Sequence, residues 1–285
     1  MARVCVLEEE RDRFRVLIEG YPLPLVNAVR RMCYIGVPVM AVDYVEVFEN
    51  NTVLYDEIIA HRLAMVPLTS EEALEKYGKP EECRDVELGD PRCYAVLRLE
   101  VETSQGEERV IYSGDLEPQD PDVRPVYPNM PIVIMVPEQK LRLQAYARLG
   151  YGSEHAKWMP VSIAAHRYLP VVEFDVEKMS NECMSCIEQA YPWLAERMKD
   201  MARGRLELLE DMNTSALYWC YRRKCSEGFK LEYDPSRLIF KVEGTGALPA
   251  RRIVLEAVRA VARKAENLLA ELQQLRRETG QEASG

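Results

Sequence analysis

The chain has 285 residues, 47% of them apolar, and a formal net charge of −10. This length and apolar content allow a sizeable core plus buried interface, so we expect one or two folded units. No apolar run approaches the roughly 18 residues needed to span a bilayer, and the first residues lack the apolar stretch of a signal peptide, so we expect a soluble, cytoplasmic protein without membrane contacts. The acidic charge disfavours binding of a phosphate backbone over a broad surface.

A β-hairpin and then a helix are predicted at the start of the chain. Apolar and polar residues alternate over 4–6 and 14–18, on either side of the acidic stretch 8–10. In the helix that follows, Pro22 and Pro24 fit the first turn. The spacing places Leu25, Val29, Met32, Cys33 and Gly36 on an apolar face and Asn27, Arg30, Arg31 and Tyr34 on another face.

A strand over 42–47 and a short helix are predicted next. The helix begins at Asp56 and Glu57, whose charges suit its positive end, and Pro67 ends it. Its apolar face carries Ile59, Leu63 and Val66. His61 lies among these residues, and a solitary histidine in such a setting is more often a packed helix residue than a catalyst.

The middle of the chain is predicted to be rich in β-strands. Alternation over 93–101, followed by a turn and by residues 110–112, indicates a second hairpin. Prolines between 118 and 131 mark a long connection, and it leads to strands over 132–136 and 141–147.

Residues 175–232 differ in character from the rest and are predicted to be an inserted subdomain. They contain cysteines and a predicted helical stretch from Pro192 to Met212. The subdomain precedes and overlaps a predicted strand pair at 229–233 and 238–242.

The last segment, 249–279, predicts a helix of about 45 Å at 1.5 Å per residue. Its apolar residues recur at alternating intervals of four and three, which is the seam of a heptad repeat. Folding back on the same chain would bury part of the seam, but its regularity favours pairing with another helix. The seam consists of Val254, Val258, Val261, Ala265, Leu268, Leu272 and Leu275.

Blocks 27–31, 56–68 and 150–160, together with the closing helix, resemble one known family. They look like the family of the D subunit of archaeal DNA-directed RNA polymerases, the counterpart of the amino-terminal region of the bacterial alpha subunit and of the third-largest subunit of eukaryotic RNA polymerase II. The resemblance implies a non-catalytic role in transcription, since the nucleotidyltransferase chemistry of the complex belongs to the large subunits.

The resemblance also implies an α+β fold in several parts. A discontinuous dimerisation domain, an antiparallel sheet with long helices, would comprise 1–48 and 244–285 with part of 150–174. A β-rich domain would be inserted at 49–170. Residues 175–232 would form a subdomain derived from a ferredoxin-like insertion.

As partners, the resemblance implies a heterodimer with the small L subunit of RNA polymerase, built from the closing helix and the helix that bears Asn27. This dimer would be the platform for the large catalytic subunits and the small N and P subunits, and DNA would be reached only through the complex. Contacts to the second-largest catalytic subunit would be expected near Asn27, Arg30, Arg31, Asp56, Glu57, His61 and Arg62.

The residue types are consistent with that expectation. Arg30 and Arg31 can each present a planar fork of donors suited to bidentate pairing with a carboxylate at a partly desolvated interface. The alternative is an intramolecular or solvated arginine, because most surface charges contribute little to binding.

Many members of the family hold an iron–sulfur cluster in the inserted region, but the cysteine pattern here is incomplete. A ferredoxin run needs three cysteines at two-residue gaps and a fourth elsewhere. This chain has only the pair Cys183 and Cys186 at that spacing, with Cys220 and Cys225 farther on. No cofactor is therefore assigned, and an iron–sulfur or zinc centre, disulfides and buried thiols all stay open for these four cysteines.

Cys83 and Cys93 flank a polar loop where the eukaryotic relative has a zinc loop. Two cysteines do not complete a tetrahedral zinc site, which favours a local disulfide or free thiols.

Enzymatic functions find little support in the sequence. It contains no P-loop, no GxSxG and no HExxH motif. Two alternatives to a polymerase subunit stay open: a metal-binding or redox-active cysteine protein centred on 183–225, and a homodimeric coiled-coil adaptor that uses 249–279.

Overall fold

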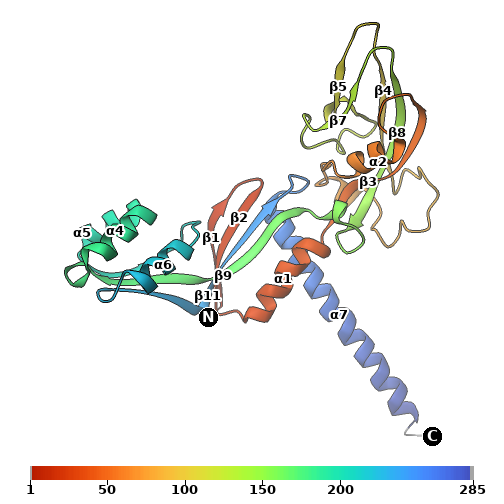
Figure 1. Ribbon diagram of the computed structural model, residues 1–285. Coiled ribbons are helices and arrows are strands. Elements are labelled where there is room, and N and C mark those ends of the chain that lie inside the picture. The colour runs from red at the N-terminus through yellow and green to blue at the C-terminus, as the bar shows by residue number, and fades with distance from the viewer. Residues whose placement is uncertain (1, 283–285) are drawn as a thin grey trace. The chain divides into compact units, whose positions relative to one another are not determined.

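The computed structural model describes residues 2–282, with side chains up to Arg276. The chain forms two compact units, each discontinuous in sequence (Figure 1). Unit 1 comprises Met1–Glu8, Arg15–Leu23 and Ala165–Phe240, and unit 2 comprises Glu9–Phe14, Pro24–Ala164 and Lys241–Gly285. Strands β9 (Val161–Asp175) and β11 (Phe229–Gly244) each carry the chain from one unit into the other.

The predicted domains at 1–48 with 244–285, at 49–170 and at 175–232 stay a prediction, because the two units are defined by compactness alone. Most of 49–170 and the closing helix fall in unit 2, whereas residues 1–8 and 15–23 group with 165–240 in unit 1. The reason is strand pairing: β1 (Arg3–Glu9) and β2 (Arg13–Glu19) join the same sheet as β9 and β11. Segments far apart in the sequence thus pack into the same core, and no local sequence pattern predicts that they do.

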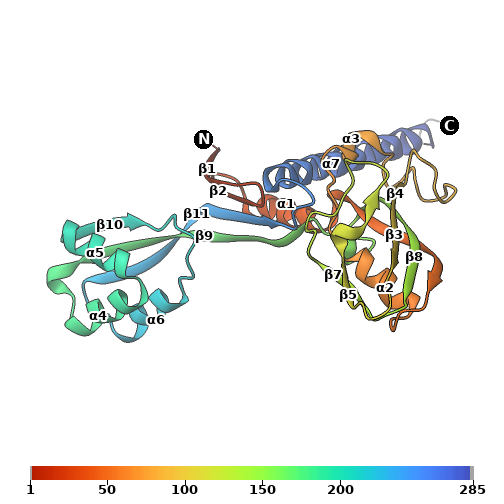
Figure 2. The same ribbon diagram turned by 90° about the horizontal axis from the view of Figure 1, so that it is seen from above.

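Most of a five-stranded sheet, in the order β1-β2-β11-β9-β10, belongs to unit 1. The edge strand β10 (Arg203–Glu207) pairs antiparallel with the end of β9. Three helices pack around this end of the sheet (Figure 2). They are α4 (Asn181–Ala190), α5 (Pro192–Met201) and α6 (Ser215–Arg223).

The start of α4 is fixed by a side-chain cap. The Ser180 hydroxyl accepts a hydrogen bond from the Cys183 backbone N–H, which satisfies one of the donors left unpaired at a helix start. Pro192 stands at the start of α5, where its missing N–H costs nothing. The faces that these helices bury include Ile187, Leu194 and Leu217, each 0% exposed.

Unit 2 contains a four-stranded sheet in the order β3-β8-β4-β6 and a two-stranded sheet of β5 and β7. The strands are β3 (Pro38–Asn50), β4 (Ala95–Glu102), β5 (Arg109–Tyr112), β6 (Glu117–Pro118), β7 (Pro131–Met135) and β8 (Lys140–Tyr151). The helices are α1 (Leu23–Ile35), which begins at the edge of this unit, α2 (Asp56–Ala64), α3 (Ala73–Lys76) and α7 (Ala250–Glu282). Short 3-10 turns cover Ser113–Asp115 and Ala156–Trp158 here and Val176–Lys178 in unit 1.

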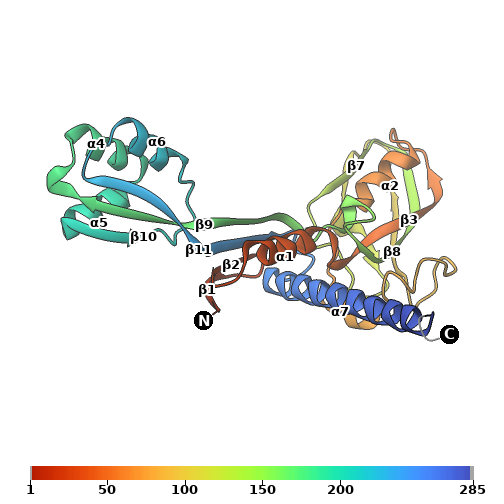
Figure 3. The ribbon, with the colours of Figure 1, turned by 90° about the horizontal axis from the view of Figure 1, so that it is seen from below.

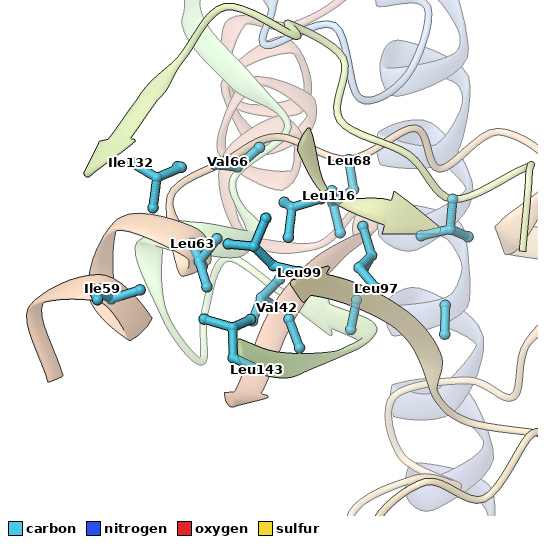
Figure 4. Close-up of a cluster of buried hydrophobic side chains, with 14 of the residues drawn as sticks. Val42, Ile59, Leu63, Val66, Leu68, Leu97, Leu99, Leu116, Ile132 and Leu143 are labelled. Carbon is cyan, nitrogen blue, oxygen red and sulfur yellow. The ribbon is translucent and has the colours of Figure 1, made fainter. Parts of the chain in front are cut away.

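The core of unit 2 lies between these sheets and α2 (Figure 4). Ile59 and Leu63 of α2 pack with Leu97 and Leu99 of β4 and with Leu143 of β8, and each is at most 1% exposed. At roughly 25 cal/mol per Å² of apolar surface, burying one such side chain contributes about 1.5–3 kcal/mol. The alternating pattern that predicted β4 is the register of this contact, since its odd-numbered residues face inward.

Three sequence-based expectations about local structure were wrong. The hairpin expected between 93–101 and 110–112 does not form: β4 pairs with β8 and β6, and β5 pairs with β7. The strand pair expected at 229–233 and 238–242 is the single strand β11, in which the Asp234 carboxylate accepts a hydrogen bond from Ser236 N. The helix expected from Pro192 to Met212 ends at Met201, because Ala202 takes φ 59° and the chain turns into β10.

No helix in the described range 2–282 is long and apolar enough to cross a membrane.

Candidate partner-binding surfaces

Helix α7 carries two apolar stripes, offset by one residue and therefore by about 100° around its axis. The first stripe is buried within unit 2 and consists of Ala250, Ile253, Ala257 and Ala260. The second stripe is the predicted seam. Its residues Val254 and Val261 are half-buried, whereas Val258, Ala265, Leu268, Leu272 and Leu275 are exposed.

Helix α7 runs beside α1 (Figure 3). A Cβ added at Gly36 would lie 3.5 Å from the Cβ of Ala260, so two small side chains allow the end of α1 and the helix α7 to approach closely. On the neighbouring turn, Glu256 is buried and accepts hydrogen bonds from Arg252 at 2.9 Å and from Arg259 at 2.6 Å. The first turns of α7 therefore have a partner within the same chain.

The described part of α7 beyond Val261 is exposed instead. Every side chain from Ala262 to Arg276 is exposed, including Leu268 at 57% and Leu272 at 53%. A soluble helix normally buries an apolar stripe, and one that stays exposed over several turns marks an interaction site. The seam beyond Ala260 thus exposes three leucines, Leu268, Leu272 and Leu275, on one side of the helix.

The polar face of α1 holds the first predicted interface block. Arg30 Nε donates to Asn27 Oδ1 at 2.9 Å, and both residues are half-buried. Arg31, on the next position, is exposed. Arg30 thus has an intramolecular partner that fixes its guanidinium in place, and Arg31 is the more accessible cation of this block.

The second predicted block is α2. Asp56 Oδ1 accepts from Asn50 Nδ2 at 2.6 Å, and Arg62 Nη1 donates to the Ile132 carbonyl at 2.5 Å. Glu57 and His61 are exposed. Asp56 and Arg62 therefore contribute to holding α2 on β3 and β7, and Glu57 and His61 point to solvent.

Sequence reasoning missed a set of exposed apolar residues beside this block. Val53 is 71% exposed and Tyr55 is 76% exposed, and Ile58 and Met65 are also exposed. Ile58 and Met65 are seven residues apart, so they share a face of α2 that lies off the buried stripe of Ile59 and Leu63. The seven-residue interval between Ile58 and Met65 is the sequence pattern from which this exposed apolar face could have been predicted.

The two blocks do not form one patch. In the structure α1 lies along α7, whereas α2 packs on β3 and β7. They are two separate surfaces of unit 2 (Figures 1 and 3).

The third block that carried the family resemblance, 150–160, is closely packed inside unit 2. Arg148 lies over the ring of Trp158 at 4.4 Å, and Lys157 Nζ lies 4.2 Å from the centre of the same ring. A Cβ at Gly150 would come within 2.3 Å of Trp158, and one at Gly152 within 2.0 Å of the Tyr34 carbonyl. The glycines are therefore required by close packing, and this block is not a nucleotide-binding loop.

A small network of ion pairs connects this block to β3. Asp43 accepts from Arg148 Nε and from Lys157 Nζ, each at 2.7 Å, and Arg148 also pairs with Glu154 at 3.3 Å. Burial disfavours the ionised carboxylate of Asp43, but the hydrogen bonds from Lys157 and Arg148 outweigh burial, so the pKa of Asp43 lies below its ordinary value.

The network makes stability depend on pH. Because the pKa of Asp43 is lower in the folded than in the unfolded chain, the contribution is present above the ordinary Asp pKa of about 4 and is lost as pH falls through the folded pKa. Asp43→Asn should therefore lower the free energy of unfolding at pH 7 by about 1–3 kcal/mol. Guanidinium unfolding of both proteins at several pH values should show this difference shrinking below pH about 4. Asp85→Asn, at an exposed position, is the control, and an equal loss in both variants would contradict the assignment.

The four cysteines of the inserted subdomain are joined as disulfides in the structure. Cys183 pairs with Cys225, and Cys186 pairs with Cys220. Both bonds tie α4 to α6 or to the residues just after it. A disulfide sulfur is not a thiolate ligand, so in this oxidised state these residues do not present the ligands that zinc or an iron–sulfur cluster needs.

Cys83 and Cys93 are also joined by a disulfide, across the polar loop of unit 2. Cys33 is a buried free thiol whose pKa burial raises to about 12, which makes it unreactive. Over residues 2–282 the structure holds no group of three or more His, Cys, Asp or Glu side chains placed to bind a metal ion.

A cleft of about 590 Å³ lies between α7, α3 and the end of β8 in unit 2. Its charged lining is already paired in part, since Arg252 contacts Glu75 and Glu256, each at 2.9 Å. Tyr151 in the same cleft has its pKa raised to about 12 by burial and by a hydrogen bond with Glu81. These are packing interactions rather than an acid–base pair poised near neutral pH.

The chain is similar to known subunits of RNA polymerase. A family model described as the RNA polymerase Rpb3/RpoA insert domain matches residues 45–171, from β3 into β9. The DNA-directed RNA polymerase subunit Rpo3 of Aeropyrum pernix is 43% identical over 263 residues, which cover 92% of each chain. Subunit Rpo3 of Pyrococcus furiosus is 36% identical over 282 residues, covering 95% of this chain and 97% of the relative. Subunit Rpo3 of Methanothermobacter thermautotrophicus is 35% identical over 265 residues, covering 92% and 96% respectively.

Proposed function

Because the chain belongs to the Rpo3 family of archaeal DNA-directed RNA polymerase subunits, which is the D-subunit family under another name, we propose that it is a non-catalytic assembly subunit that pairs with the small L subunit through α7. The heterodimer then serves as the platform on which the large catalytic subunits and the small N and P subunits assemble. DNA is reached only through the complex.

The observation that carries this proposal is the exposed seam of α7. Its leucines lie on one face, spaced by three and four residues, and the same chain covers a different face of the helix. A helix of the L subunit that packs on this seam would remove the exposed leucine side chains from water. At about 0.8 kcal/mol per buried CH₂ this burial favours a stable complex.

The two polar blocks are proposed as later contacts with the second-largest catalytic subunit. Arg31 on α1 and Glu57 and His61 on α2 are exposed and available for such contacts. Arg30 and Asn27 are paired with each other within α1, so they would act mainly by orienting the guanidinium group of Arg30. Asp56 and Arg62 bond to β3 and β7, so they would act mainly by positioning α2.

Co-expression tests the proposal. The chain produced with a candidate L subunit should elute from size-exclusion chromatography as a one-to-one complex, and the chain produced alone should aggregate or be poorly soluble. A stable, soluble homodimer of the chain alone would favour a coiled-coil adaptor instead. Failure to form any heterodimer would refute the proposed function.

A further inference from the structure

A second surface, far in sequence from the seam of α7, lies on the outer face of α6 in unit 1. Residues three, four, seven and eight positions apart share one side of a helix, and on α6 these positions are Ser215, Tyr218, Trp219, Arg222 and Arg223. All five are exposed, with Trp219 at 53% and Tyr218 at 48%. The opposite side of α6 buries Leu217 and Cys220 in the subdomain core.

The charges on this face are unmatched. Neither Arg222 nor Arg223 has an ion pair with any residue that the structure describes, and the face itself carries no acidic residue. The next cation, Lys224, differs in this respect because it pairs with Glu182 of α4 at 3.3 Å. Two guanidinium groups beside two aromatic rings are therefore left without intramolecular counterparts.

The face is also held rigidly. Cys220 lies within α6 and is bonded to Cys186, and Cys225 follows the helix and is bonded to Cys183, so the C-terminal half of the helix is covalently tied to α4. A surface that is already fixed loses little conformational freedom on binding, which favours affinity.

We propose that the outer face of α6 is a docking site for an acidic polypeptide segment that also carries an apolar or aromatic side chain. Trp, Tyr and Arg are the residues most enriched where a few side chains supply most of the binding energy. Arg222 and Arg223 suit bidentate pairing with Asp or Glu, and the rings of Tyr218 and Trp219 offer flat apolar surfaces.

Single-stranded nucleic acid fits this face less well. Only Arg222 and Arg223 are uncompensated cations on it, so about two phosphates would be neutralised, which gives little of the counterion release that drives binding of nucleic acids. Bases could stack only on the rings of Tyr218 and Trp219, whereas single-strand sites combine such rings with a positively charged groove that follows about 4–16 nucleotides. The site is also independent of the proposed pairing through α7, because it lies in the other unit.

Peptide selection on the full-length chain tests the proposal. A displayed library of random 12-residue peptides is panned against the wild-type protein, and an enriched peptide is synthesised with a fluorescent label for anisotropy titrations. We expect enriched peptides to combine Asp or Glu with apolar residues. Trp219→Ala, and Arg222→Glu combined with Arg223→Glu, should each weaken binding of the labelled peptide at least tenfold.

Arg203→Glu combined with Arg205→Glu is the matched control, because it makes the same change in charge at exposed positions of the same unit. It should change the affinity by less than twofold. Unchanged circular dichroism and disulfide content show that each variant is folded. The proposal is overturned by a lack of enrichment, by peptides without acidic residues, by equal loss in the control, or by tighter binding of a 20-nucleotide single strand of DNA or RNA.

Discussion

Reducing the disulfides of unit 1 is expected to melt the subdomain of α4, α5 and α6 at least 15 °C below the melting temperature of the oxidised protein. The two bonds close loops with sequence separations of 42 and 34 residues. Loop entropy alone assigns about 4 kcal/mol to either bond. Because one loop lies within the other, the combined contribution is smaller than the sum, about 5–7 kcal/mol.

This contribution is large relative to what the subdomain core supplies. Its buried cluster is built around short helices, with residues such as Ile187, Leu194, Met198 and Leu217, and a core of this size gives only a few kcal/mol of net stability. Each kcal/mol corresponds to about 4–8 °C in a domain of 60–100 residues, so loss of both bonds exceeds the expected threshold.

Thermal melts with and without a phosphine reductant measure the effect, with tryptophan emission as the probe because Trp193 and Trp219 lie in the subdomain. Cys183→Ser combined with Cys225→Ser should reproduce part of it. Cys83→Ser combined with Cys93→Ser, which opens a loop with a separation of 10 residues in unit 2, should leave this transition in place. A fall of less than 5 °C on reduction would show that packing rather than cross-linking stabilises α4 and α6.

Leu268→Asp combined with Leu272→Asp is expected to abolish the proposed heterodimer while leaving the fold of the chain intact. Both side chains are more than half exposed in the isolated chain, and exposed substitutions usually change stability by no more than about 0.5 kcal/mol. In the complex, the same positions would place unpaired carboxylates in an apolar seam. Each such burial costs several kcal/mol, so the dissociation constant should rise at least about 10³-fold.

The matched control for charge is Ala270→Asp combined with Gln273→Asp. Both positions are exposed, and the helical rotation of 100° per residue places them on the side of α7 away from Leu268 and Leu272. Pull-down and size-exclusion chromatography with the L subunit should show a complex for the control and none for the seam variant. Equal behaviour of the two variants would mean that the partner, if it binds, uses another surface.

Much of the local structure follows from the sequence. Helical spacing predicted α1, α2 and α7, because an amphipathic helix shows its buried stripe directly as an interval of three and four residues. Alternation predicted β1, β2, β4 and β8 in the same way. The apolar seam of α7 could also be predicted, because its residues recur at heptad spacing. It is offset by one residue from the stripe that the chain itself buries.

Strand partners were less visible in the sequence. Residues 110–112 follow residues 93–101 closely, but β4 pairs with β8 because Leu97, Leu99 and Val101 match a longer alternating strand on the same core face. Local proximity favours a hairpin only when no better buried register exists elsewhere in the chain. The same argument applies to β11, which continues as one strand through the break expected between 233 and 238.

By itself, the sequence determined α1, α2, α7 and several strands, the apolar seam from Val254 to Leu275 and the family resemblance. Each of these depends on local spacing or on short blocks of residues. Tertiary structure alone decided how Cys183, Cys186, Cys220 and Cys225 pair, and that α1 and α2 present separate surfaces. It also decided which stripe of α7 is buried by its own chain. These outcomes depend on distances between residues far apart in sequence, and such distances are set only when the sheets and helices pack.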